Sequence, residues 1–111
     1  MKTDRELLEA AAKAAGIKLL RSRLDDPMCR DMLPEIQNSV AVGWNPLTDD
    51  GDALRLAVKL GLEVGHNSFG NVVVDHYTQP EVRKIVLPHG DDPYAATRRA
   101  IVRAAAAMVE H

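Results

Sequence analysis

The densest group of side chains that can bind an anion is an arginine cluster near the C-terminus. Arg98 and Arg99 are adjacent, and Arg103 follows Arg99 by four residues. Positions four apart share one face of a helix, so Arg99 and Arg103 can address one group together. A guanidinium offers a planar fork of N–H donors that matches a phosphate or a carboxylate. The alternative is a solvated helix face whose arginines pair with Asp or Glu.

Trp44 and His66 are the other candidates for contact with a ligand or a partner. Trp44, the one tryptophan of the chain, can serve as a stacking platform or as the anchor of an interface. Its place before Asn45 and Pro46, at the end of an expected strand, also suits a core anchor, and we expect it to be mostly buried. His66 opens a polar, glycine-containing turn at 66–70, which is the next surface to consider.

The spacing of potential metal ligands argues against a metal site. The four histidines are 10, 13 and 22 residues apart, and Cys29 is the only cysteine. Zinc sites commonly include a short-spaced ligand pair, which this chain lacks. The acids at 49–52 do not have the alternation of a calcium loop and instead suit the cap of a helix. We expect no metal and no cofactor.

The sequence contains no motif of an established catalytic class. There is no GxSxG, P-loop or GxGxxG pattern, and nothing places Cys29 or Ser68 next to a histidine. We therefore expect a protein without enzymatic activity. A small hydrolase or nuclease that lacks motifs is the last alternative.

Composition indicates a single α+β domain spanning residues 1–111. Hydrophobic residues make up 46 % of the chain and the net charge is −2, which argues against disorder. The longest apolar run, 104–109, is far shorter than the roughly 20 residues of a membrane span. The acidic N-terminus does not suit a secretory signal, and the lone cysteine suits a reducing cytoplasm. The balanced charge argues against a nucleic-acid partner.

Three helices are expected, each with recognisable end signals. Thr3 and Glu6 form a capping box for a helix at 4–15. The helix expected at 50–60 has N-cap oxygens at 48–50. Asp92 and Pro93 mark the start of a helix at 94–109. In the second helix we expect a buried face formed by Ala53, Leu56, Ala57 and Leu60. The opposite, polar face carries Asp52, Arg55 and Lys59. In the third, the expected buried stripe is Tyr94, Thr97, Ile101, Ala104 and Met108.

Alternating apolar residues predict strands at 17–23, 38–44, 62–65, 71–78 and 82–87. The short connections after residue 61 favour an antiparallel meander. The predicted order is α-β-β-α-β-β-β-α, with a small, mostly antiparallel sheet of about four or five strands. Helices on one face, or on both faces as a three-layer α/β/α sandwich, both fit this order.

The stretches WNPLTDDGDALRLAVKLGL at 44–62 and DDPYAATRRAIVRAAA at 91–106 resemble small phage-encoded proteins that carry a phage ABA sandwich domain. The opening TDRELLEAAAKAAGI is similar to the first helix of such proteins. The resemblance implies a fold and a phage or prophage setting, and it transfers no catalytic residue.

We therefore expect a non-enzymatic accessory protein that binds a host or phage protein in the cytoplasm and antagonises or redirects a host factor. The main alternative is a protein that sequesters a nucleotide-like anion through Arg98, Arg99 and Arg103. A homo-oligomer is compatible with either hypothesis.

Overall fold

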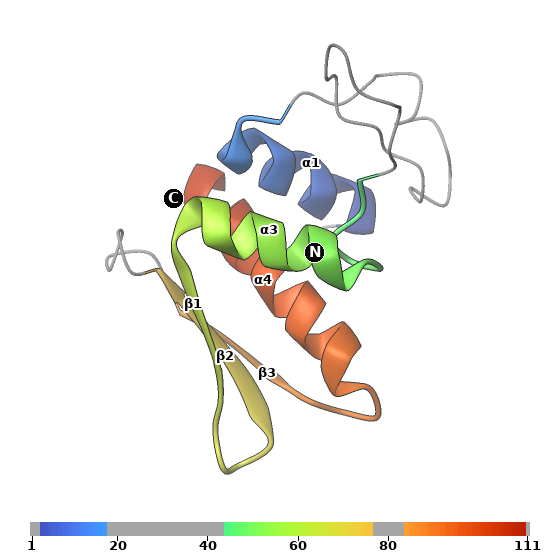
Figure 1. Cartoon of the computed structure of the whole chain (residues 1–111), viewed down its shortest axis with the longest axis vertical. Coiled ribbons are helices and arrows are strands. Elements are labelled where there is room, and N and C mark those ends of the chain that lie inside the picture. The colour runs from blue at the N-terminus through green and yellow to red at the C-terminus, as the bar shows by residue number, and fades with distance from the viewer. Residues whose placement is uncertain (1–2, 18–43, 77–83, 111) are drawn as a thin grey trace.

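Three helices and a three-stranded antiparallel sheet form the part of the chain that the computed structural model describes, residues 3–17, 44–76 and 84–110 (Figure 1). In chain order the elements are α1 (Asp4–Ala15), α3 (Asp50–Leu60), β1 (Leu62–His66), β2 (Asn71–His76), β3 (Ile85–Pro88) and α4 (Pro93–Glu110). This arrangement confirms the α+β class and the three helices. The expected strands at 17–23 and 38–44 lie almost entirely outside the described residues, as does Cys29, so a sheet of four or five strands stays a prediction.

The helix ends follow the local signals of the sequence. At the start of α1, Thr3 Oγ1 accepts from the Glu6 N–H, and Glu6 Oε1 accepts from the Thr3 N–H, each at 3.1 Å. The N-cap of α3 is Asp49, and Asp92 Oδ1 accepts from the Ala95 N–H in the first turn of α4. These short-range bonds satisfy donors that a helix terminus leaves without partners, which is why the boundaries were predictable.

The sheet has the order β1-β2-β3, and both strand pairs are antiparallel. Val74 is the central partner, because it lies opposite Val64 on one side and Ile85 on the other. Asn67 shapes the β1–β2 turn, since its Oδ1 accepts from the N–H groups of both Phe69 and Asn71. The sheet is thus a meander with one tight turn, as the short connections predicted.

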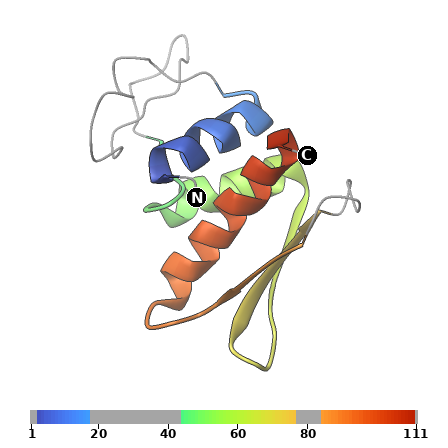
Figure 2. The ribbon, with the colours of Figure 1, turned by 180° about the vertical axis from the view of Figure 1, so that it is seen from behind.

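Helix α4 lies at the centre of the described fold. It packs against α1 and α3 on one side and against the strands on the other, and Figures 1 and 2 show it running diagonally between them. Val72 and Val74 of β2 are fully buried beneath it. Alanines on both helices allow α1 and α4 to pack closely, among them Ala11, Ala12, Ala104 and Ala105.

The opposite face of the sheet carries no helix among the described residues. Val73 and Asp75 on that face are half-buried, whereas their neighbours Val72 and Val74 are buried. The described residues therefore do not form a three-layer sandwich.

Two expectations about helix faces were wrong. Tyr94 is 71 % exposed, although the helical stripe placed it with buried Ile101, because none of the other described elements covers the first turn of α4. Asp52 is buried at 7 % exposure, although the pattern placed it on the polar face of α3. Its carboxylate is buried because it accepts a hydrogen bond from a neighbouring turn, as described below.

Candidate functional site

The described surface contains a largely apolar groove of about 420 Å³ between α3, β1 and the first half of α4. Leu54 of α3, Val64 of β1 and Tyr94 and Ile101 of α4 provide apolar walls. The volume is within the usual range for sites that bind small molecules or peptide side chains. The groove therefore brings together side chains that are far apart in the sequence, such as Leu54 and Ile101, which are 47 residues apart.

Several of the apolar side chains in and beside this groove are exposed to an unusual degree. Leu54 is 63 % exposed, Tyr94 71 % and Val64 39 %. Val58, one helical turn after Leu54 on α3, is 73 % exposed. Single exposed apolar residues are ordinary, but a group that lines one concave surface marks a site of interaction.

The amphipathic pattern of α3 explains why Leu54 and Val58 point away from the core. The helix buries Ala53, Leu56 and Ala57 against the rest of the fold. Leu54 and Val58 are four residues apart, so they form a second apolar stripe on the other side of α3. This stripe does not belong to the core that the described residues form.

Arg98 closes one wall of the groove and is held by two contacts from the N-terminal side of α3. Its Nη1 lies 2.7 Å from Asp50 Oδ1, and its Nε donates to the Leu47 carbonyl at 2.9 Å. The side chain is only 17 % exposed. Arg98 therefore links α4 to the start of α3, and its positive charge is already paired with the Asp50 carboxylate.

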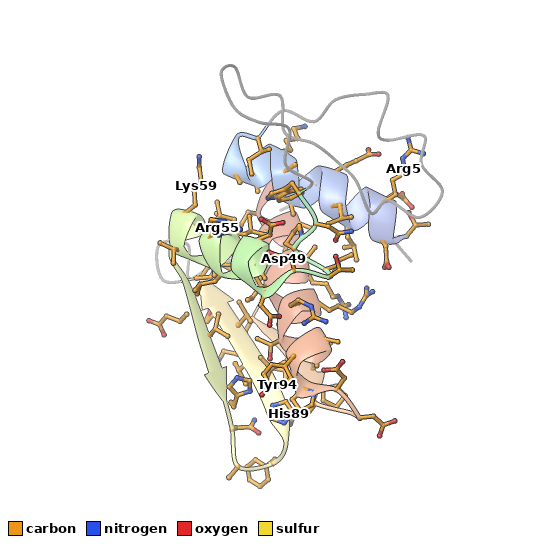
Figure 3. The ribbon with its side chains drawn as sticks, turned by 45° about the vertical axis from the view of Figure 1, so that its right-hand side comes forward. Arg5, Asp49, Arg55, Lys59, His89 and Tyr94 are labelled. Atoms are coloured by element: carbon orange, nitrogen blue, oxygen red, sulfur yellow. The ribbon has the colours of Figure 1, made fainter. Side chains whose placement is uncertain are left out.

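His66 lies at the far end of the groove and pairs with a second histidine that the sequence did not single out. His66 Nδ1 and His89 Nε2 are 2.8 Å apart, and the ring centroids are separated by 4.9 Å. The contact joins the end of β1 to the turn before α4. In Figure 3, His89 and Tyr94 lie at the end of the molecule opposite Arg5 of α1. The pair positions His66 as one wall of the groove.

The remaining candidate residues lie away from the groove. Arg99 Nη2 donates to Asp4 Oδ1 of α1 at 2.9 Å, which ties α4 to the start of α1. Arg103 is exposed and forms no ion pair with any residue that the structure describes. The three guanidinium groups thus have different surroundings, and together they do not form one anion site of unpaired charges.

Replacement of both Arg99 and Arg103 by alanine should leave the fold nearly unchanged. The Arg99–Asp4 pair is solvent-exposed on both sides, and such pairs contribute between zero and about 1 kcal/mol to stability. Urea unfolding followed by circular dichroism measures the change. A loss well above 1 kcal/mol would contradict the surface placement of these two side chains.

Trp44 is 7 % exposed and belongs to the hydrophobic core, which confirms the expectation of burial. It begins a turn in which Asn45 Oδ1 accepts from the Leu47 N–H, while the Asn45 carbonyl accepts from the Asp49 N–H at 2.9 Å. Pro46 is fully buried in the same turn. Trp44 therefore anchors the entry to α3 and is not available as a stacking platform.

Asp52 joins that turn to α3. Its Oδ2 accepts from the Asn45 N–H at 3.0 Å, and its Oδ1 lies 2.7 Å from Arg55 Nη2. The hydrogen bond with Asp52 raises the pKa of the Arg55 guanidinium, whose charge is retained in any case. The WNP segment is thus a structural support for the wall of the groove that α3 provides.

Residues 3–17, 44–76 and 84–110 contain no group of three or more His, Cys, Asp or Glu side chains arranged to hold a metal ion. In the same ranges, no helix has the length and apolar character that crossing a bilayer requires.

His66 and Arg98 of the groove were predicted from the sequence as contact residues, whereas its apolar members Leu54, Val64 and Tyr94 were not. The signal available was the pair of leucine and valine at positions 54 and 58, four residues apart and outside the buried stripe of their helix. The exposure of Tyr94 left no such signal, because its position fits the buried stripe of α4 equally well.

Comparison of the chain with family models, with curated proteins and with solved structures found no match.

Proposed function

We propose that this protein is a non-enzymatic binding module whose groove receives apolar side chains of a partner protein. The observation that carries the proposal is the exposure of Leu54, Val64 and Tyr94 around one concave surface. Burial of such side chains is the main source of affinity in protein association. Tyrosine in particular is enriched among the residues that dominate the binding energy of interfaces.

The chemistry of the groove defines the segment that fits it. The apolar walls favour an aliphatic or aromatic side chain inserted between α3 and α4. His66 and Thr97 at the margin offer hydrogen bonds to the flanking backbone of the partner. Because Arg98 already binds Asp50, the inserted group need not carry a negative charge. The partner expected from the phage resemblance is a host or phage protein of the cytoplasm.

Sequestration of a nucleotide-like anion has less support. Two of the three arginines on which it depends, Arg98 and Arg99, already contact Asp50 and Asp4. The paired carboxylates compensate part of the positive charge of these two arginines and so weaken their attraction for an anion. Arg103 alone offers a single charge on an exposed helix face, and such a charge is screened by salt.

Site-specific photo-crosslinking tests the proposal. A benzoylphenylalanine placed at Leu54, at the groove, is compared with one at Arg103, which does not line it. Each variant is irradiated in extract from cells that produce the protein, and the adducts are identified by mass spectrometry. We expect a discrete protein adduct from position 54 that is lost when Tyr94→Ala is added, and none from position 103.

Adducts from position 103 but not from position 54 would contradict the groove as the binding surface. So would an adduct at position 54 that survives the Tyr94→Ala change unaltered, because a contact made inside the groove must involve that side chain. Folding of each variant is checked by circular dichroism before irradiation, so that a lost adduct reports on binding.

A further inference from the structure

We propose that the outer edge of β1, with which no other described strand pairs, forms an antiparallel pair with β1 of a second copy of this chain around a two-fold axis. The dimer would join the two three-stranded sheets into one of six strands. The inference concerns the strand edge and does not depend on what the groove binds. It rests on the hydrogen-bonding pattern of the sheet and on the residues that each edge carries.

The ladder shows which backbone groups of β1 face outward. The Asn67 N–H donates to the Asn71 carbonyl, so this pair is hydrogen-bonded. In an antiparallel ladder, such pairs alternate with pairs that exchange no hydrogen bonds. By the register of β1 and β2, Glu63 and Gly65 then point their backbone groups toward β2. The backbone groups of Leu62, Val64 and His66 consequently point toward the outer edge.

Among the described residues, the β3 edge of the sheet carries devices against strand pairing, whereas the β1 edge carries none. The His89 N–H donates to the Gly70 carbonyl, so this pair is hydrogen-bonded. By the same alternation, the backbone groups of Lys84, Val86 and Pro88 point away from β2, toward the outer edge of β3. Lysine and proline at an edge are common devices against strand pairing, and proline has no N–H to donate. Strand β1 contains neither residue, and four of its five positions are exposed.

Charge and the number of hydrogen bonds together select one register among those that align the outward groups. Pairing centred on Glu63 would bring two like carboxylates directly opposite each other, which destabilises a strand pair. Pairing centred on Gly65 would align only two hydrogen-bonded pairs, or about four hydrogen bonds. Pairing centred on Val64 sets Leu62 opposite His66 of the partner subunit and aligns three pairs, or about six hydrogen bonds. It also sets each Glu63 opposite a glycine.

This register also accounts for two exposed apolar residues outside the strand. The β1–β2 turn, which carries Phe69 at 87 % exposure, would run beside the α3–β1 junction of the partner subunit. Val58, at 73 % exposure, lies close to that junction. A stable interface needs about 800 Å² from each subunit, more than a five-residue edge supplies alone. The two symmetric contacts of turn and helix end add to it.

The dimer has a consequence for the groove. A two-fold axis perpendicular to an antiparallel sheet keeps the same face of both subunits on the same side. Both grooves would then open on one face of the six-stranded sheet. A partner with two docking segments could engage both at once, and its avidity would exceed that of one groove.

Sedimentation equilibrium of the full chain, from micromolar to millimolar concentration, tests the proposal. We expect the mass to approach twice 12.2 kDa as the concentration rises. Val64→Pro removes an outward N–H without breaking the β1–β2 ladder and should weaken the dimer about tenfold or more. Val86→Pro is the matched control, because it removes an outward N–H from the β3 edge, and it should leave the dimerisation constant unchanged.

A wild-type chain that stays at 12.2 kDa up to millimolar concentration would overturn the proposal. Equal weakening by Val64→Pro and Val86→Pro would also overturn it. If either proline variant unfolds, cysteines at the same two positions on a Cys29→Ser background decide with a short bis-maleimide. Dimers must then form from position 64 and not from position 86. These results leave the crosslinking test of the groove unaffected, so failure of one proposal is distinct from failure of the other.

Discussion

Replacing Trp44 by alanine should destabilise the protein by about 3–5 kcal/mol, the range typical of a large aromatic removed from a core. The side chain is buried to 7 % exposure and belongs to the same core as Leu8 and Val72. Its removal leaves a cavity at the entry to α3, where the neighbouring Pro46 is also buried. Because the surrounding turn is fixed by hydrogen bonds that Asn45 accepts from the Leu47 and Asp49 N–H groups, the cavity has little freedom to collapse.

Urea unfolding monitored by circular dichroism measures this loss, with Tyr94→Ala as the matched aromatic control. Tyr94 is 71 % exposed, so its truncation should change stability by no more than about 0.5 kcal/mol. Tryptophan fluorescence of the native protein gives an independent check, because a buried indole emits at shorter wavelength than free tryptophan in water. Emission at the wavelength of free tryptophan, or equal losses for the two variants, would contradict the anchor role of Trp44.

The Asp52→Ala change should cost about 1–3 kcal/mol, although Asp52 is a charged residue in the first turn of a helix. The change removes the acceptor for the Asn45 N–H, and Asn45 is only 6 % exposed. A buried donor without a partner carries the full penalty of its desolvation. The change also removes the carboxylate that lies 2.7 Å from Arg55.

Two comparisons separate these contributions in the same unfolding experiment. Asp52→Asn retains an oxygen that can accept from the Asn45 N–H and should restore part of the stability. Glu63→Ala removes an exposed acid from β1 and should have an effect within about 0.5 kcal/mol. If Asp52→Ala were as mild as Glu63→Ala, the hydrogen bond to Asn45 would not support the turn.

The helices were predictable because their boundaries depend on residues close in sequence. Thr3 with Glu6, and Asp92 with the Ala95 N–H, are bonds between residues three apart. A single sequence contains everything needed to recognise them. The same holds for the antiparallel meander, whose connections are too short for crossovers.

The groove was not predictable, because exposure depends on which elements cover a residue and not on its own type. Tyr94 and Ile101 have the same helical phase, yet one is exposed and the other is buried at 5 %. The difference arises because α4 extends beyond α3 (Figure 1), and the other described elements leave its first turn uncovered. Periodicity identifies the side of a helix that faces inward but not the point along the helix where its cover ends.

The role of Arg98 was hidden for a related reason. Its partner Asp50 is 48 residues away in the sequence, and only the packing of α3 on α4 brings the two together. The cluster of three arginines therefore looked like one basic surface. In the fold, Arg98 pairs with Asp50 of α3, Arg99 pairs with Asp4 of α1, and Arg103 is exposed to solvent.

The most direct test of the groove as the binding surface is the affinity of the purified protein captured by crosslinking. Isothermal titration calorimetry would compare wild type with Leu54→Ala/Tyr94→Ala and with Arg99→Ala/Arg103→Ala. A pair of interface anchors contributes about 2 kcal/mol or more, so the groove variant should bind at least about 30-fold more weakly. The arginine variant should stay within about threefold of wild type, because exposed charges contribute little. Wild-type affinity in the groove variant, together with a large loss in the arginine variant, would contradict the account and place the binding surface on the arginine face of α4.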